Sequence, residues 1–177
     1  MVDMHFKIES GKISDIDELE KLYNNLNDYL ETTVNYPGWK KGIYPTRADA
    51  VSGIGNGLFV LRVGNTIAGS VILNHIPEAA YTKATWGIDA GEKEVMVIHT
   101  LVTHPEFMKQ GVAQKLLELA REYSLSIGCR TIRLDVNIQN EPAIALYEKC
   151  GYTYVETVDL GLPYEDLKWF HLYEFIL

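Results

Sequence analysis

The 177-residue sequence contains little cysteine, no long apolar run and a deficit of positive charge. Its two cysteines, Cys129 and Cys150, cannot build a disulfide framework, and neither stands in a C-x-x-C or other metal-ligand spacing. We interpret both as reduced thiols, as in cytosolic proteins. No apolar run approaches the roughly 20 residues that span a bilayer, and the start "MVDMHFKIES" lacks the apolar stretch of a signal peptide. We therefore expect a cytoplasmic protein without a membrane partner.

Positive charge is scarce, since 16 Lys and Arg residues stand against 24 Asp and Glu residues, for a net charge of −8. A nucleic-acid-binding protein needs a basic stripe to neutralise phosphates, so the charge balance argues against a nucleic-acid partner and favours a neutral or cationic substrate. Hydrophobic residues make up 47% of the chain and charged residues 23%, which is typical of a globular protein with a real core. The length predicts a single domain over residues 1–177.

Hydrophobic periodicity predicts seven strands and four helices. The strands are expected at 5–10, twice within 58–75 around a Gly64-Asn65 turn, and at 94–103, 130–136, 152–160 and 168–177. The helices are expected from Ser14 to about Thr32 with an N-cap in "SDID", after Thr46 with Asp49 as its capping partner, from Val112 to Ile127 and within 140–151. Antiparallel runs followed by one β-α-β unit indicate an α/β fold whose central twisted sheet is mixed and mostly antiparallel, with helices on both faces.

A glycine opens the helix that follows the 94–103 strand. A tight turn at a helix N-terminus binds anions, because the first N–H groups of the helix have no internal acceptor and carry the positive end of its dipole. In Lys109-Gln110-Gly111-Val112-Ala113 successive amides could face a phosphate, and Gly111 and Ala113 keep side chains away from it. Taken alone, the glycine could equally mark an ordinary turn. Neither G-x-G-x-x-G nor the P-loop pattern is complete, so a nucleotide-binding α/β protein has no full motif in its favour.

Two segments carry a family resemblance. The run "MKQGVA" (108–113) resembles motif A of the GNAT-type N-acetyltransferase superfamily, in which a strand ending in a proline is followed by [RQ]-x-x-G-x-[GA]. The segment "NEPAIALYEKCGY" (140–152) is similar to N-x-x-A-x-x-L-Y-x-K-x-G-[FY] of the same superfamily at every specified position. The resemblance covers about 98–154. Met108 departs from the usual Arg or Gln, and there we expect the backbone amide, rather than the side chain, to contact phosphate.

The resemblance implies a GNAT-like fold, acetyl-CoA as the co-substrate and transfer of its acetyl group to a primary amine in a ternary complex. The amine could belong to a small molecule or to a protein. It also implies that an amide near Leu101 or Val102 polarises the thioester carbonyl while the glycine turn holds the pyrophosphate. The expected acetyl-CoA contacts are Leu101, Val102, Thr103, Met108, Lys109, Gln110, Gly111, Val112, Ala113, Asn140 and Tyr147. A non-catalytic acyl-CoA sensor on the same fold is the alternative function.

Amide formation from a thioester requires removal of a proton from the amine and protonation of the leaving thiolate. The family resemblance implies that Tyr147 is the general acid. A phenol with a pKa near 10 can protonate a thiolate whose conjugate thiol has a pKa near 8.5 at a cost of about 2 kcal/mol. Without the motif, Tyr147 would be a core tyrosine and Asn140 a plain helix N-cap. Glu94 and His99 are equal candidates for the base, and a structural role for His99 stays open.

Recognition of the acceptor amine is expected outside the two motifs. Trp39 and Tyr44 lie in the aromatic segment "YPGWKKGIYP" (36–45) and suit a cationic amine through cation–π contacts, although such aromatics also serve packing. The five histidines form no H-x-H or H-x-x-x-H pair with a nearby carboxylate, so we expect no metal. Edge strands at the C-terminus could pair two subunits as a homodimer.

Overall fold

The computed structural model describes residues 5–177 and contains seven strands and four α-helices in the predicted order. The sheet order is β1-β2-β3-β4-β5-β7-β6. β1–β2, β2–β3, β5–β7 and β6–β7 pair antiparallel, whereas β4 (Val95–Thr103) and β5 (Thr131–Asn137) pair parallel. The prediction of an α/β fold with a mixed, mostly antiparallel sheet is therefore confirmed.

The chain forms two compact units, and β4 and α3 (Val112–Ser126) each continue from one unit into the other. Unit 1 comprises the described residues up to Val34, then Trp39–Leu73 and His99–Glu118. Unit 2 comprises Asn35–Gly38, Asn74–Ile98 and Leu119–Leu177. The single domain expected over 1–177 stays a prediction.

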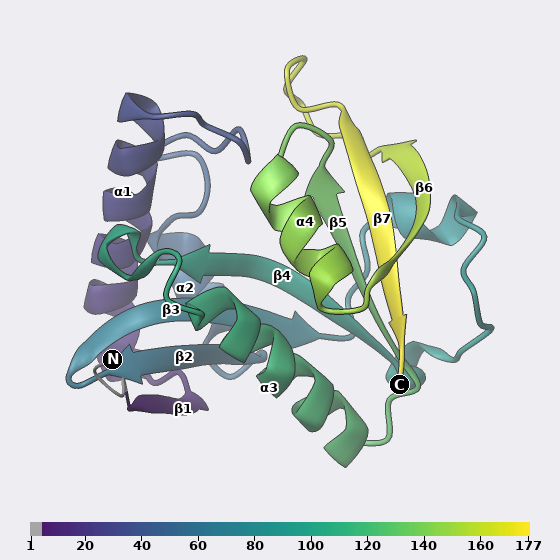
Figure 1. Ribbon diagram of the computed structural model, residues 1–177, viewed down its shortest axis with the longest axis horizontal. Coiled ribbons are helices and arrows are strands. Elements are labelled where there is room, and N and C mark those ends of the chain that lie inside the picture. Colours follow the sequence, from purple (N-terminus) through teal and green to yellow (C-terminus); the bar gives the residue numbers. More distant parts are fainter. Residues whose placement is uncertain (1–4) are drawn as a thin grey trace. The chain divides into compact units, whose positions relative to one another are not determined.

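Unit 1 begins with a meander of β1 (Phe6–Ser10), β2 (Leu58–Val63) and β3 (Thr66–Asn74) (Figure 1). Val63 pairs with Thr66 across the predicted Gly64-Asn65 turn, in which Gly64 has a φ of 59°. Glycine adopts this left-handed conformation without steric cost, which is why such hairpin turns favour it. The predicted hairpin is confirmed.

The two helices of unit 1 are α1 (Ile16–Thr32) and α2 (Arg47–Gly53). The N-cap of α1 is Asp15, inside the predicted segment, but its carboxylate accepts from the backbone N–H of Lys12, upstream of the helix, at 2.9 Å. The predicted capping box of α2 is confirmed, because the Thr46 N–H donates to Asp49 Oδ2 at 2.6 Å.

The core of unit 1 lies between these helices and the sheet. Apolar residues recur on α1 at intervals of three and four, which places them on one face, while alternate residues of β2 and β3 supply the opposite wall. Val102 of β4 belongs to the same cluster. The buried members are Leu19, Leu22, Tyr23, Leu26, Leu30, Ala50, Leu58, Val60, Ile67, Ile72 and Val102.

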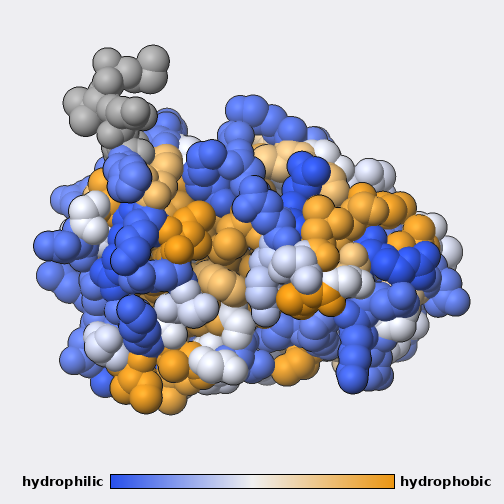
Figure 2. Space-filling view, turned by 90° about the horizontal axis from the view of Figure 1, so that it is seen from below, coloured by the Kyte–Doolittle hydropathy of each residue, from blue (hydrophilic) through white to orange (hydrophobic). Residues whose placement is uncertain are grey.

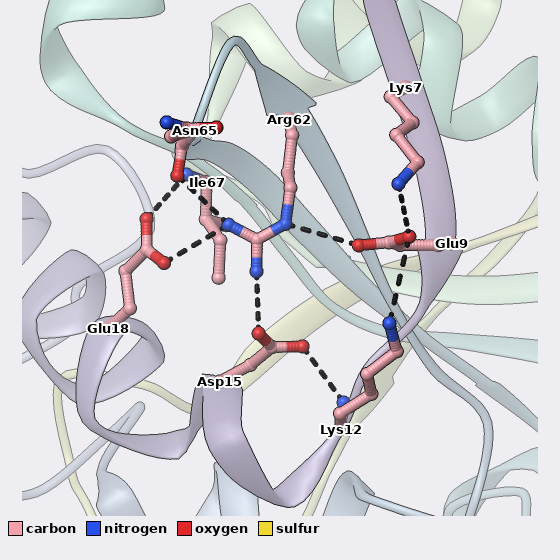
Figure 3. A network of polar contacts seen from close by, with 8 residues as sticks. All are labelled: Lys7, Glu9, Lys12, Asp15, Glu18, Arg62, Asn65 and Ile67. Atoms are coloured by element: carbon pink, nitrogen blue, oxygen red, sulfur yellow. Dashed lines mark hydrogen bonds and ion pairs between the residues drawn. The ribbon is translucent and has the colours of Figure 1, made fainter.

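Arg62 of β2 connects β1 and the start of α1 at the edge of that core (Figure 3). Its guanidinium donates to Asp15 Oδ1 at 2.5 Å, to Glu18 Oε2 at 3.1 Å and to Glu9 Oε1 at 3.3 Å. The second Glu18 oxygen accepts from the backbone N–H of Ile67 at 2.7 Å. Because the Asp15 side chain is only 7% exposed, this carboxylate depends on Arg62 for its charge compensation.

Unit 2 is built on β5, β7 (Trp169–Ile176) and β6 (Thr153–Asp159), with α4 (Glu141–Lys149) alongside β5 and β7 in Figure 1. Neighbouring residues of β7 serve opposite faces of this sheet. Tyr173 contacts the ring of Tyr147 on α4, at 6.4 Å between centroids, whereas Leu172 packs with Tyr81. Tyr81 comes from the 3₁₀ turn η2 (Ala79–Lys83), within the long connection between β3 and β4. That connection therefore covers the face opposite α4.

Hydrophilic residues occupy much of the face shown in Figure 2, and apolar residues gather there in separate groups.

Cys129 and Cys150 form no disulfide, as expected from their spacing. Among residues 5–177, no helix has the length and apolar character needed to cross a bilayer.

Candidate active site

The glycine turn lies in unit 1 and links the end of β4 to α3. A 3₁₀ turn, η4 (Pro105–Phe107), follows the strand, and His104 caps it by accepting from the Glu106 N–H at 3.2 Å. Lys109 has a φ of 61° and Gly111 a φ of 86°. Two left-handed residues so close together curl the chain into a concave turn, a geometry in which successive N–H groups can converge on an anion.

The residues of this turn lie at the surface of unit 1. The first hydrogen bond of α3 runs from Lys115 N–H to Gly111 O at 3.0 Å, so the preceding amides of the helix start have no acceptor within the helix. A Cβ added at Gly111 would meet no atom within 4 Å, and Lys109, Gln110 and Gly111 are all exposed. The turn therefore offers open space beside the start of α3, where a phosphate could approach the backbone.

The backbone amide of Met108, which was expected to contact phosphate, has a hydrogen-bond acceptor within the protein. Its backbone N–H already donates to Pro105 O at 3.3 Å, and its side chain packs against the core of unit 1. The phosphate contact expected of this amide stays a prediction, and it would compete with the hydrogen bond to Pro105. The side chain that replaces the family's Arg or Gln serves packing instead.

A second glycine, which the sequence analysis did not single out, fixes the start of α3 against the sheet. A Cβ on Gly69 of β3 would lie 2.6 Å from Val112 Cγ1 and 2.7 Å from Val102 O. Only glycine fits at this distance, so the helix start sits directly on the strand. Val112 is buried, which holds the open amides of the turn on a rigid base.

The strand that precedes the turn is irregular. β4 pairs with β5 only from Val95 to Val97, and Thr100 has a φ of 49°. A β-branched residue in this conformation interrupts the regular strand and redirects the residues that follow. Leu101 and Thr103 are half-buried and Val102 is buried, so these expected acetyl-CoA contacts lie on the distorted part of β4.

The aromatic pair Trp39 and Tyr44 lies beside this part of β4 in unit 1. The two rings meet edge to face at 5.3 Å, and Trp39 packs against the core. The Tyr44 hydroxyl lies 2.5 Å from Thr100 Oγ1. Both residues therefore have structural contacts, and their expected role in binding the amine stays a prediction.

The second motif of the sequence, residues 140–152, lies in unit 2 and includes α4. Asn140 caps the helix by accepting from the Ala143 N–H at 3.4 Å, which confirms the N-cap interpretation of this residue. Tyr147 is 7% exposed and packs edge to face against Tyr152 at 5.9 Å. Burial among aromatic rings restricts the phenol to one orientation, which a proton donor requires.

Asp135 of β5 is the residue that sequence reasoning missed. Tyr81 donates its phenol proton to Asp135 Oδ2 at 2.7 Å across 54 positions of sequence. The pKa of Asp135 is raised to about 6. Burial is the main cause and the charge of Glu78 adds to it, while the hydrogen bond from Tyr81 acts in the opposite direction. Burial raises the pKa of Tyr81 well above its usual value, as do the nearby Asp135, Glu78 and Tyr147. Tyr81 and Asp135 are therefore in direct contact in unit 2, and the charge of Glu78 affects the pKa of both.

A signal for Asp135 was present in the segment "TIRLDVN" (131–137). Alternate residues of β5 are polar and share the face opposite the buried Ile132, Leu134 and Val136. On that face Arg133 donates to Glu174 Oε1 at 3.1 Å, with its guanidinium 4.3 Å from the centroid of the Trp86 ring. A polar stripe in a central strand indicates either a buried network or a site.

The two expected base candidates lie in different units. Glu94 ends the 3₁₀ turn η3 (Glu92–Glu94) one residue before β4, so its expected position on the strand is wrong by one residue. Its Oε2 accepts from the Gly91 N–H at 2.8 Å, which caps the 3₁₀ turn. The same oxygen lies 3.6 Å from Arg130 Nη1 in an ion pair. His99 is half-buried in the unit 1 part of β4.

Residues 5–177 contain no cluster of His, Cys, Asp or Glu that could hold a metal ion.

Comparison with known proteins agrees with the resemblance. The model of the acetyltransferase (GNAT) family matches residues 19–152. An uncharacterized N-acetyltransferase of Methanocaldococcus jannaschii is 27% identical over 143 residues, which cover 76% of this chain and 59% of that protein. The match therefore spans about three fifths of the relative's length.

Solved structures show the same fold. The ribosomal-protein-S18-alanine N-acetyltransferase of Escherichia coli has a TM-score of 0.70 and 16% identity, with 97% of this chain and 94% of that chain covered. An acetyltransferase of Salmonella typhimurium, solved with acetyl-CoA, has a TM-score of 0.69 and 15% identity over the same shares of the two chains.

Proposed function

Because the chain belongs to the acetyltransferase (GNAT) family, we propose that it transfers the acetyl group of acetyl-CoA to a primary amine by direct attack in a ternary complex. The amine nitrogen bonds to the thioester carbonyl carbon, the carbon–sulfur bond breaks, one proton leaves the amine and one reaches the thiolate. The observation that carries the proposal is the open glycine turn, whose donors from Lys109 onward fit a pyrophosphate. The acidic chain suits an amine that arrives as a cation.

Tyr147 is proposed as the acid that protonates the thiolate. Its support is the helix motif, its burial and its fixed packing against Tyr152 and Tyr173. Asn140 supports Tyr147 indirectly, because its cap sets the start of the same helix. These arguments rest on the residues of unit 2 and on the family resemblance.

Asp135 is proposed as the base in place of Glu94 or His99. Tyr81 fixes Oδ2 of this carboxylate, and in the proposal Oδ1 accepts the amine proton directly or through a water. With a pKa of about 6, the carboxylate is mostly ionised at pH 7 and still basic enough to accept a proton. Glu94, by contrast, is occupied in capping.

Thermal unfolding with acetyl-CoA, CoA, NAD or ATP tests the binding part of this proposal. A ligand at about 100 times its Kd adds roughly 2.7 kcal/mol to the free energy of unfolding, or roughly 5 to 10 °C for a chain of this size. Stabilisation by acetyl-CoA and CoA alone is expected. Stabilisation by NAD or ATP instead would refute the assignment.

A thiol-release assay with a panel of small amines and peptides then tests the chemistry. Formation of CoA that depends on the amine is the expected result, with the acetylated product confirmed by mass. Stabilisation by acetyl-CoA without turnover across the panel would favour the alternative of a non-catalytic acyl-CoA sensor. Sedimentation of the same sample measures whether the protein is a homodimer, which stays a prediction.

A further inference from the structure

Thr100 is held in a backbone conformation that its side chain disfavours. It lies in the middle of β4 with a φ of 49°, where a β-branched residue crowds its own backbone. Such residues persist only where surrounding contacts determine the conformation, and they cluster at functional sites. Thr100 is 9% exposed, so those contacts come from the protein interior.

The contact to its side chain comes from Tyr44, 56 positions earlier in the sequence. The Tyr44 hydroxyl and Thr100 Oγ1 lie 2.5 Å apart, a short hydrogen bond in which either group can donate. Tyr44 is itself fixed at its backbone, because its carbonyl accepts from Asn27 Nδ2 at 3.2 Å and its N–H donates to Lys40 O at 3.0 Å. Asn27 is buried on α1, so the connection between α1 and α2 is anchored to the helix and to β4 at once.

We propose that Tyr44 is a positioning residue for acetyl transfer, which acts by holding Thr100 so that the amide of Leu101 or Val102 keeps the direction needed to polarise the thioester carbonyl. The inference rests on the proposed function and gives Tyr44 a role different from the expected contact with the amine. An amide polarises a carbonyl only when its N–H points at the oxygen, so a change in the Thr100 backbone would misdirect the donors that follow.

The role predicts a specific kinetic signature. Loss of a donor aimed at the developing oxyanion lowers kcat by about 100- to 1,000-fold, so a donor that is kept but misdirected should cost less, about 10-fold. The pyrophosphate turn is untouched, so KM for acetyl-CoA should change by less than about 2-fold. A residue that contacted the amine directly would instead raise KM for the amine.

The experiment compares four variants of the full chain with the wild type. Tyr44→Phe and Thr100→Val each remove one hydroxyl of the bond, and each should lower kcat about 10-fold. The double variant should be no slower than either single variant, because both remove the same interaction. Thr100→Ser keeps a hydroxyl and should retain most of kcat. Tyr29→Phe, on an exposed tyrosine of α1, is the control for loss of a phenol.

Amide hydrogen exchange measured by NMR without any ligand supplies a second readout. Tyr44→Phe should speed exchange at residues 100–103 relative to Tyr29→Phe and leave 109–115 unchanged. Three results would each overturn the positioning role. Tyr44→Phe could leave both kcat and amide exchange unchanged, or it could raise only KM for the amine. The third result is a loss of kcat in the double variant equal to the product of the two single losses. If the wild type fails to transfer acetyl groups, the proposed function fails, while exchange at 100–103 still decides whether Tyr44 holds Thr100.

Discussion

Replacing Asp135 by asparagine should make the protein less active and, above pH 6, more stable. Asparagine keeps an oxygen that can accept from Tyr81 but cannot take a proton from an amine. Loss of a general base lowers kcat by about 100-fold or more. In the wild type kcat should rise with pH and reach half its plateau near pH 6, the pKa of Asp135. At pH 5 it should then be about one tenth of the plateau.

The gain in stability follows from the same pKa. Burial raises the pKa of Asp135 from its ordinary 3.8 to about 6, so between these values the folded state binds the proton more tightly than the unfolded state. The free energy of unfolding therefore falls as pH rises from about 4 to about 6, by up to about 3 kcal/mol at 1.36 kcal/mol per pKa unit. Asparagine does not ionise, so the variant should avoid this loss, which is worth roughly 5 to 10 °C at pH 8.

Urea unfolding and initial rates, each measured from pH 4 to 8, test both parts on the same samples. The two proteins should be about equally stable near pH 4 and diverge toward pH 8. Asp89→Asn, on an exposed loop of unit 2, should behave as the wild type in both assays. An Asp135→Asn variant that is less stable at pH 8 and fully active would refute the reasoning. In that case a matching loss in Glu94→Gln or a His99 variant would identify the base.

Three further predictions concern the acid, the turn and the polar network. Tyr147→Phe should lower kcat about 100-fold and leave the midpoint shift with acetyl-CoA intact; unchanged turnover in the thiol-release assay would remove the acid role. Gly111→Ala should cost about 1 to 2 kcal/mol because its φ is 86°, and it should also raise KM for acetyl-CoA. Gly128→Ala, with a φ of 84° and equally open space, should cost the same stability without the change in KM, so equal KM values for both variants would refute the phosphate role. Arg62→Met leaves Asp15 buried without its partner and should cost about 3 to 5 kcal/mol in urea unfolding, whereas Arg47→Met, at an exposed pair with Asp17, should cost less than about 1 kcal/mol. Equal costs would mean that the Arg62 network contributes no more than a surface pair.

Helices, strands and the caps of helices could be predicted from the sequence, because they depend on neighbouring residues. Residue periodicity predicted seven strands and four helices in the observed order, because the spacing of apolar residues indicates the buried face of a helix or strand. The capping box at Thr46, the cap at Asn140 and the left-handed Gly111 follow from interactions within a few residues. The glycine turn was predicted for the same reason.

The pairing of side chains that are distant in the sequence became visible in the folded protein. Tyr81 reaches Asp135 across 54 positions and Tyr44 reaches Thr100 across 56, and no local pattern pairs them. Local rules would place Thr100 in an extended strand, and the left-handed conformation follows from contacts made elsewhere in the fold. The pKa of Asp135 likewise depends on burial, which a sequence position does not specify. Periodicity reports a residue's face, whereas these interactions depend on which loop the fold brings against that face.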